Sequence, residues 1–306
     1  MRLLPFLLSL TFICSACSLR QITVDQTAQV FKHGAAAMDK EWDYELAATS
    51  FAPTIKTLET FLYSSPQNPV LLKLLARLYS GYGMVVLEDQ LERMAASSDD
   101  LDANPAVEQL RLRAKEMHLR AHRYGLRLLE THETGAKETF KKGREALEKF
   151  LASCDEDDVE GLFWAAAPLS MAINVDREDV ALMGNIAKIK AILERVVALN
   201  EGFYFANAHV ILGSLYGSVG PMLGGDAKRA REHFERALKL TKRRFLLVQL
   251  MYAKTLAVQV QDRKLFDALL DEVDKADINI LVDQRLANVG AKRQATRLRA
   301  RASELF

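Results

Sequence analysis

Cysteine is scarce in this sequence, and its scarcity excludes several kinds of site. Of three cysteines, Cys14 and Cys17 lie in the N-terminal leader, which leaves Cys154 for the rest of the chain. One cysteine forms neither an internal disulfide nor a paired zinc or redox motif. We interpret Cys154, beside the acidic run at 155–160, as a part-buried bystander and not a nucleophile. The fold must therefore depend on a packed core.

Glycine, proline and net charge are also low. With 15 Gly and 7 Pro in 306 residues, the composition favours an ordered helical protein over a disordered one. The 41 basic and 40 acidic residues nearly cancel, so no overall field favours nucleic acid or an acidic membrane surface. Beyond the N-terminus, charges interrupt every apolar run before roughly 18 residues, which predicts no transmembrane span.

The N-terminus has the pattern of a secretory signal. An apolar segment at 3–13 follows a basic residue, and Cys14-Ser15-Ala16-Cys17 resembles a bacterial lipobox, although Leu is usual at its first position. We predict that residues 1–16 are a cleaved lipoprotein signal and that Cys17 is lipidated. The alternative is the cleaved signal of a soluble secreted protein. Ser18 stands where an Asp would retain a lipoprotein at the inner membrane, which favours the outer membrane.

Helical periodicity extends over the rest of the chain, with no convincing strand alternation. Prolines after Asn68 and Asn104 predict two helix starts with capping residues. Asp176, Asp226 and Asp262 each precede an amphipathic run and are predicted N-caps. Short gaps indicate antiparallel neighbours. We predict roughly a dozen helices in one continuous array.

Parts of this array repeat. The words LARLY at 75–79 and LGSLY at 212–216 match the first helix of a tetratricopeptide unit, and A-x-x-x-F-x-x-A at 230–237 matches the second. The loop between these helices is longer than in a standard repeat. We therefore predict an all-α fold, an irregular tetratricopeptide-like helical repeat array (an α-α superhelix), in a single domain at 17–306.

A glycine segment, GPMLGGDA at 220–227, stops short of a phosphate-binding loop. Asp226 and Ala227 stand where Lys and Ser or Thr are required, and no buried strand precedes the segment. Asp226 also puts a carboxylate where a nucleotide would put its phosphates. We interpret Gly224, Gly225 and Asp226 as a structural turn that caps the next helix.

Other combinations of polar residues do not predict catalysis. His118 and His122 lie one helical turn apart but lack the glutamate of H-E-x-x-H. The acidic run at 155–160 lacks the glycine and the last glutamate of a calcium loop, and is better interpreted as the charged start of a helix. We predict no enzyme, no metal and no cofactor.

The repeat register, together with one aromatic on a helix with few charges, supplies candidates for contact with a ligand or partner on the concave face: Lys73, Arg77, Trp164, Asn207 and Ser214. Lys73 and Arg77 lie four residues apart on one helix face, where exposed side chains would hold a carboxylate. The alternative for this pair is a solvated basic edge. For Trp164 the alternative is core packing.

Four stretches of the second half carry a family resemblance: LFWAAA, AHVILGSLYGSVGPMLGGDAKRAREHFERAL, VQDRKLFDALLDEV and the closing LANVGAKRQATRLRARASELF. They resemble the T component of tripartite ATP-independent periplasmic (TRAP) transporters, and the N-terminal half matches more loosely. The resemblance implies a helical periplasmic lipoprotein, with a pore or cleft, that partners a TRAP solute-binding protein. It implies no catalytic residues.

We therefore predict a non-enzymatic accessory lipoprotein, anchored through Cys17 to a bacterial membrane and facing the periplasm. It would dock a periplasmic solute-binding protein and assist delivery of a small organic ligand, without binding nucleic acid. A homo-oligomer is compatible with the sequence. The alternative function is a tetratricopeptide scaffold for envelope or outer-membrane assembly.

We expect Cys17→Ser to abolish acyl labelling and to release the protein from membranes, because the lipid on this residue is the predicted anchor. Labelling with a palmitate analogue, followed by fractionation after a salt wash, measures both effects. A variant that stays in the membrane fraction would place the anchor elsewhere.

Overall fold

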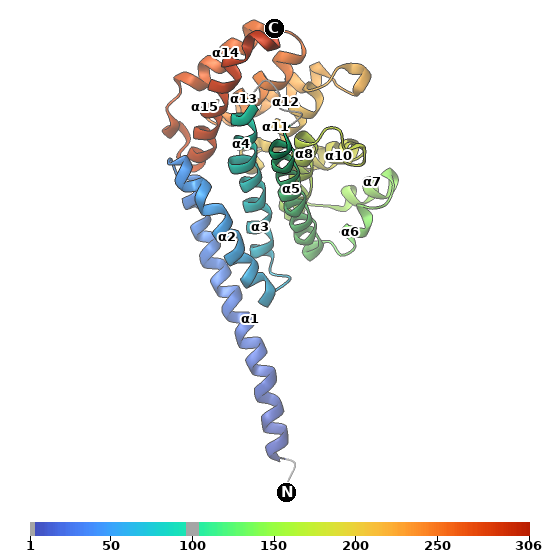
Figure 1. The fold of residues 1–306 in the computed structure, drawn as a ribbon. Coiled ribbons are helices and arrows are strands. Elements are labelled where there is room, and N and C mark those ends of the chain that lie inside the picture. Colours follow the sequence, from blue (N-terminus) through green and yellow to red (C-terminus); the bar gives the residue numbers. More distant parts are fainter. Residues whose placement is uncertain (1–3, 96–103) are drawn as a thin grey trace.

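The structure is a computed structural model that describes residues 4–95 and 104–306, of which residues 4–18 and 95 are described by their backbone alone. The lipidation prediction at Cys17 therefore falls outside the described side chains. Every regular element in these ranges is helical, which confirms the all-α prediction (Figure 1). Counting the short ones, the described residues form sixteen α-helices where the sequence predicts about a dozen.

Within the described ranges, two π-helical segments (η1, η4) and three 3-10 segments (η2, η3, η5) interrupt the α-helices. In chain order they are α1 (Leu4–Asp39), α2 (Tyr44–Ser64), α3 (Pro69–Gly81), η1 (Tyr82–Glu88), α4 (Asp89–Ala95), α5 (Pro105–His132), α6 (Ala136–Thr139), α7 (Arg144–Ser153), η2 (Glu156–Asp158), α8 (Val159–Val175), α9 (Val180–Met183), α10 (Ile186–Asn200), α11 (Phe203–Gly217), η3 (Pro221–Leu223), α12 (Ala227–Leu240), α13 (Leu247–Tyr252), η4 (Ala253–Ala257), α14 (Arg263–Lys275), η5 (Ile278–Gln284), α15 (Arg285–Ala300) and α16 (Ala302–Leu305).

Four of the five predicted N-caps are confirmed. The side chains that accept a hydrogen bond from a backbone amide in the first turn of their helix are those of Asn68, Asn104, Asp226 and Asp262. The prediction for Asp176 is wrong. This residue ends α8 and binds Lys115 at 2.6 Å, while Asp179 caps the short α9 that follows.

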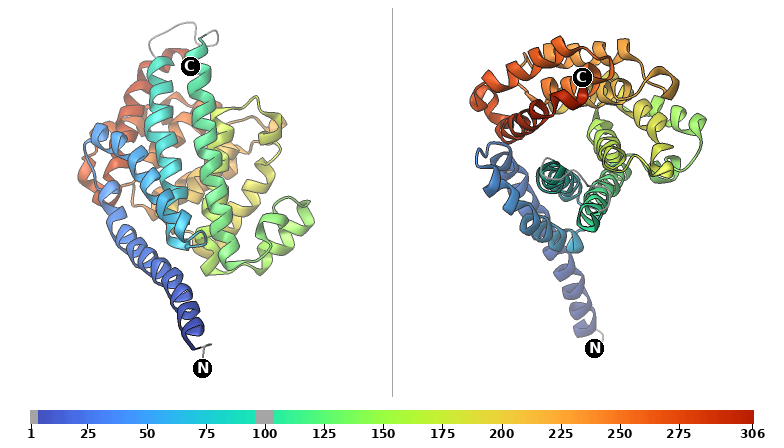
Figure 2. Two further views of the ribbon diagram at one scale, coloured as in Figure 1. Left: turned by 60° about the horizontal axis from the view of Figure 1, so that its bottom comes forward. Right: turned by 45° about the horizontal axis from the view of Figure 1, so that its top comes forward.

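The helical path from Pro69 to Met94, through α3, η1 and α4, runs through the middle of the molecule. Figure 2 shows α1 and α2 on one side of it and α5 and α8 on the other. By length and composition this path could cross a membrane, which the sequence did not predict, but 61% of its most apolar stretch is buried inside the protein. It is therefore the central core helix of the array.

The helix pairs that carry the repeat words pack closely. Gly213 of α11 lies against Phe234 of α12, where an added Cβ would be 2.9 Å from the ring. Ala76 of α3 and Ala114 of α5 are fully buried, and these two helices pack against each other. Small residues thus allow close approach in both pairs. The assignment of the whole array as tetratricopeptide-like repeats stays a prediction.

Buried charges join α4 to the C-terminal helices. Asp89 is 1% exposed and is paired with Arg297 of α15 at 2.7 Å and with Arg93 at 2.6 Å. Arg297 also binds Glu92 at 2.8 Å, and Glu92 binds Lys254 at 2.8 Å. Burial opposes the charge of Glu92, but these two cations lower its pKa. The contacts bring α15 beside the first helices (Figure 2).

The glycine segment forms a tight turn between η3 and α12. Gly224 has φ of 81°, in the left-handed region that favours glycine. The amide of Gly225 donates to the carbonyl of Gly220 at 3.1 Å. A Cβ on Gly225 would lie 1.8 Å from the carbonyl oxygen of Val219. Glycine is needed at 224 for its dihedral angle and at 225 for close backbone contact.

We expect Gly225→Ala to lower the free energy of unfolding by more than Asp226→Ala, which should cost about 1 kcal/mol through its lost cap. The methyl group that alanine adds at position 225 would collide with backbone atoms, which cannot move aside as a side chain can. Gly220→Ala is the matched control, because the atom nearest to an added Cβ there, the side-chain nitrogen of Gln259, is 3.6 Å away. Urea unfolding of the three variants measures the order, and equal stability of the two glycine variants would contradict it.

Candidate functional site

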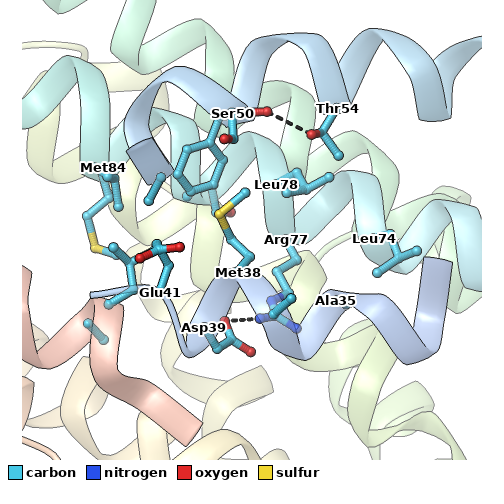
Figure 3. Close-up of a pocket in the computed structure, with 18 of the residues that line it drawn as sticks. Ala35, Met38, Asp39, Glu41, Ser50, Thr54, Leu74, Arg77, Leu78 and Met84 are labelled. Atoms are coloured by element: carbon cyan, nitrogen blue, oxygen red, sulfur yellow. Dashed lines mark hydrogen bonds and ion pairs between the residues drawn. The ribbon is translucent and has the colours of Figure 1, made fainter. Parts of the chain in front are cut away.

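A cavity of about 600 Å³ lies between α1, α2, α3, α8 and α11, and η1, η5 and α15 also contribute to its wall. Its lining is mostly apolar, with side chains such as Leu74, Leu78 and Met84 (Figure 3). This volume is within the range of small-molecule sites, which are typically apolar with a few polar groups that orient the ligand. The cavity is therefore the candidate site.

One ion pair lies in the wall of this cavity. The Arg77 guanidinium of α3 binds the Asp39 carboxylate at the end of α1 (Figure 3), and their side chains are 19% and 20% exposed. Burial raises the pKa of Asp39 although Arg77 lies beside it. Burial also opposes the charge of Arg77, but the neighbouring Tyr204 and Asp39 raise its pKa, so the guanidinium stays charged.

Aromatic rings form the wall on the α8 and α11 side. Trp164 packs edge-on against Phe163 at 5.1 Å and against Tyr204 at 5.4 Å between ring centroids. The Tyr204 ring lies 5.8 Å from the Arg77 guanidinium carbon. Trp164 is buried and lines the cavity at the same time. Core packing and ligand contact are therefore not alternatives for this residue.

A left-handed turn positions Tyr204. Three successive residues, Tyr204, Phe205 and Ala206, have φ of 45°, 59° and 57° before the regular part of α11 begins. Residues other than glycine rarely adopt this left-handed region of backbone dihedral angles. Such backbone strain is often found at functional sites. The surrounding rings, including Phe245 against Phe205 at 5.8 Å, hold the turn in place.

Three of the five predicted contact residues line the cavity: Arg77, Trp164 and Asn207. Lys73 is not among the lining residues, because its ammonium group binds Glu160 of α8 at 2.5 Å. The predicted exposure of Lys73 and Arg77 is wrong. Both lie on the central helix α3, so each meets a carboxylate of a neighbouring helix in place of solvent.

Ser214 also lies outside the cavity lining. Its hydroxyl donates to the carbonyl of Val210, one turn earlier in α11, at 2.8 Å. Val210 itself is buried. Of these positions on α11, Asn207 therefore lines the cavity, whereas Val210 and Ser214 do not.

Residues 40–306 match the family of TRAP transporter T-components. The chain belongs to this family. An uncharacterised protein of Treponema pallidum (strain Nichols) is 23% identical over 320 aligned positions, which cover all of this chain and 98% of that protein. The family match confirms the resemblance. It assigns the protein to the accessory subunits of TRAP transporters, in the bacterial envelope.

The first helix of this T component forms a wall of the cavity that the sequence did not predict. Phe31, Gly34, Ala35 and Asp39 of α1 all line it. Nothing lies within 4 Å of where a Cβ on Gly34 would be, so the small side chains of this stretch leave space in the cavity. The run of small residues was visible in the sequence, but its packing partners were not.

The other polar candidates of the T component have structural partners. Cys154 is buried, its thiol donates to the carbonyl of Phe150 at 3.3 Å, and burial raises its pKa to about 12. His118 lies 2.7 Å from Glu88, and the ring of His122 donates to a backbone carbonyl at 2.6 Å. Within the described ranges, His, Cys, Asp and Glu side chains form no group of three that could hold a metal ion.

We expect the neutral dye N-phenyl-1-naphthylamine to fluoresce with the wild-type T component and much less with Gly34→Leu. The leucine side chain would extend into the open space of the cavity and take up volume needed by the dye. Gly143→Leu is the matched control, because Gly143 also has no atom within 4 Å of an added Cβ and does not line the cavity. Equal loss of signal in both variants would contradict binding in the cavity.

Proposed function

We propose that this T component docks a TRAP-type periplasmic solute-binding protein at the mouth of its cavity, and that a small organic molecule passes through the cavity on its way to the permease. The family membership supports the transport role. The observation that carries the proposal is the apolar cavity of about 600 Å³ with one ion pair in its wall.

Exposed apolar side chains at the cavity rim supply a docking surface. Val30 and Leu46 line the cavity and are also largely exposed. Trp42, next to the lining residue Glu41, is 62% exposed. Exposed tryptophan is costly in water and is enriched at the centres of protein interfaces. A partner seated on this rim would cover these side chains and the cavity mouth together.

The proposed lipid anchor fits the same arrangement. Helix α1 runs without interruption through Cys17 to Asp39 at the cavity wall (Figure 1). With a rise of 1.5 Å per residue, this part of the helix spans about 33 Å. A lipid on Cys17 would hold the cavity at that distance from a membrane, the outer one as Ser18 favours, and raise the local concentration of docked partners.

We expect Trp42→Ser to weaken binding of the cognate solute-binding protein by roughly tenfold or more, as for a central interface tryptophan. Val180→Ser is the matched control, because Val180 of α9 is 83% exposed but does not line the cavity. Calorimetry with the purified solute-binding protein measures both. Equal affinities would remove Trp42 from the interface, and no binding by the wild type would favour the envelope-scaffold alternative.

A further inference from the structure

Arg77 is the one cation among the described residues that line the cavity. The other charged lining residues are Asp39, which it binds, and Glu41, whose carboxylate accepts hydrogen bonds from the amides of Trp42 and Asp43 at 2.8 Å. The remaining lining side chains are apolar or neutral. The cavity therefore offers a ligand a large apolar volume and one guanidinium, and that guanidinium is already occupied.

We propose that the cavity takes a molecule with an apolar body and a single carboxylate, and that Asp39 occupies the place of this carboxylate on Arg77 while the cavity is free of ligand. The inference rests on the proposed function for its biological role. Its chemistry rests on the cavity alone, so it can be tested without a partner protein.

The guanidinium selects the polar group of the ligand. Arginine presents a planar fork of N–H donors that matches a carboxylate, and it stays protonated even when it is partly buried. Tyr204 keeps Arg77 in place from the opposite helix, with 5.8 Å between its ring and the guanidinium carbon. The side chain is thus held at the cavity wall whether its partner is Asp39 or a ligand.

The apolar lining selects the rest of the ligand. Apolar side chains line the cavity from several helices: Leu58 from α2, Leu74 from α3, Trp164 from α8 and Leu286 from α15. A second charge on the ligand would be buried there without a partner, which is strongly unfavourable. A single carboxylate on an apolar body avoids this cost.

Binding of an anion requires that Asp39 lose its charge. Two carboxylates on one guanidinium in an apolar wall would leave a net buried negative charge. Burial already raises the pKa of Asp39, so proton uptake by this side chain is the least costly adjustment. The exchange balances: the ligand carboxylate and one proton come in, the ligand pairs with Arg77, and Asp39 becomes a neutral carboxylic acid.

The surroundings of Asp39 support this exchange from each packed element. The groups that face it are Arg77 of α3, Lys40 in the turn after α1 and Asp283 of η5, with Tyr204 of α11 on the far side of Arg77. Asp283 raises the pKa of Asp39 further, and Lys40 opposes it. Since Lys40 also pairs with Asp283 at 3.1 Å, these two largely offset each other.

The test compares dodecanoate with its neutral analogue dodecanol, both below micellar concentration, by calorimetry with the purified full chain. We expect Asp39→Asn to bind dodecanoate roughly tenfold or more tightly than the wild type at neutral pH, since the internal competitor is gone. Dodecanol affinity should not change. The double variant Asp39→Asn with Arg77→Gln keeps the wall neutral and should bind dodecanoate no better than dodecanol.

Proton uptake gives a second, independent measurement. In buffers of different ionisation enthalpy, the wild type should take up close to one proton for each dodecanoate bound, and Asp39→Asn none. As the pH falls through the pKa of Asp39, the affinities of the two proteins should converge, because Asp39 then carries its proton before the ligand binds. Lys73→Gln, which removes an ion-paired cation outside the cavity lining, is the control and should behave as the wild type.

Equal dodecanoate affinity in wild type and Asp39→Asn would overturn the proposal, as would binding without proton uptake or no binding of either probe by the wild type. Thermal melts of each variant show whether a loss reflects unfolding. If dodecanoate binds as expected but the solute-binding protein does not, the proposed transport role fails and the ligand site stands. If the solute-binding protein docks but dodecanoate does not bind, the proposed ligand site fails and the transport role stands.

Discussion

The pairing of Asp89 with arginines of α15 is the interaction on which the enclosed shape depends. A buried carboxylate costs several kcal/mol unless cations accompany it, and Asp89 is 1% exposed. One of its partners, Arg297, lies 208 residues later in the sequence. Arg297 of α15 joins Arg93 of α4 itself in accompanying this buried charge. The contact brings α15, which contributes to the cavity wall, beside the helical path from Pro69 to Met94.

The cavity itself is the second constraint, because protein interiors are normally close-packed and empty apolar volume is destabilising. The cavity of about 600 Å³ opens to solvent and so leaves apolar surface in contact with water, which an occupant would cover. The helical path from Pro69 to Met94 changes to the π-helical segment η1 next to the cavity, and Met84 and Val85 of η1 line the cavity. Such segments are frequent at functional sites. The π-helical segment η1 and the left-handed turn at Tyr204 both border the cavity.

Local features of the fold could be predicted from the sequence, and contacts between distant segments could not. The caps at Asn68 and Asp226 depend on their own helices, so residue type and spacing were sufficient. The partners of Lys73 and Arg77 depend on where α1 and α8 pack, which the repeat register does not contain. The register treats their helix as the lining of an open groove. In the structure that helix is surrounded, so its basic side chains meet internal carboxylates.

The same reasoning explains which parts of the site the sequence indicated. Arg77, Trp164 and Asn207 lie on helices that the patterns place in the array, and they line the cavity. The α1 wall was missed because the sequence assigns the start of that helix to an export signal. The left-handed turn at Tyr204 was missed because it contains neither glycine nor asparagine, the residues that usually mark such a turn. The surrounding aromatic rings hold the backbone in this left-handed conformation. Those rings come from distant parts of the sequence, so the residues of the turn alone do not predict it.

The position of α1 connects the proposed anchor, the cavity and the docking rim in one element. Its lower part is fixed by Asp25, which accepts hydrogen bonds from Ser65 at 2.8 Å and Asn68 at 2.6 Å. Its upper end is held by the Asp39 pair, three residues before Trp42 of the rim. On the proposed exchange, a ligand releases the upper contact and leaves the lower one intact. Ligand binding would then loosen the part of α1 that the proposed partner covers, so docking and ligand occupancy would be coupled through Asp39, and by linkage each would change the affinity for the other by the same factor.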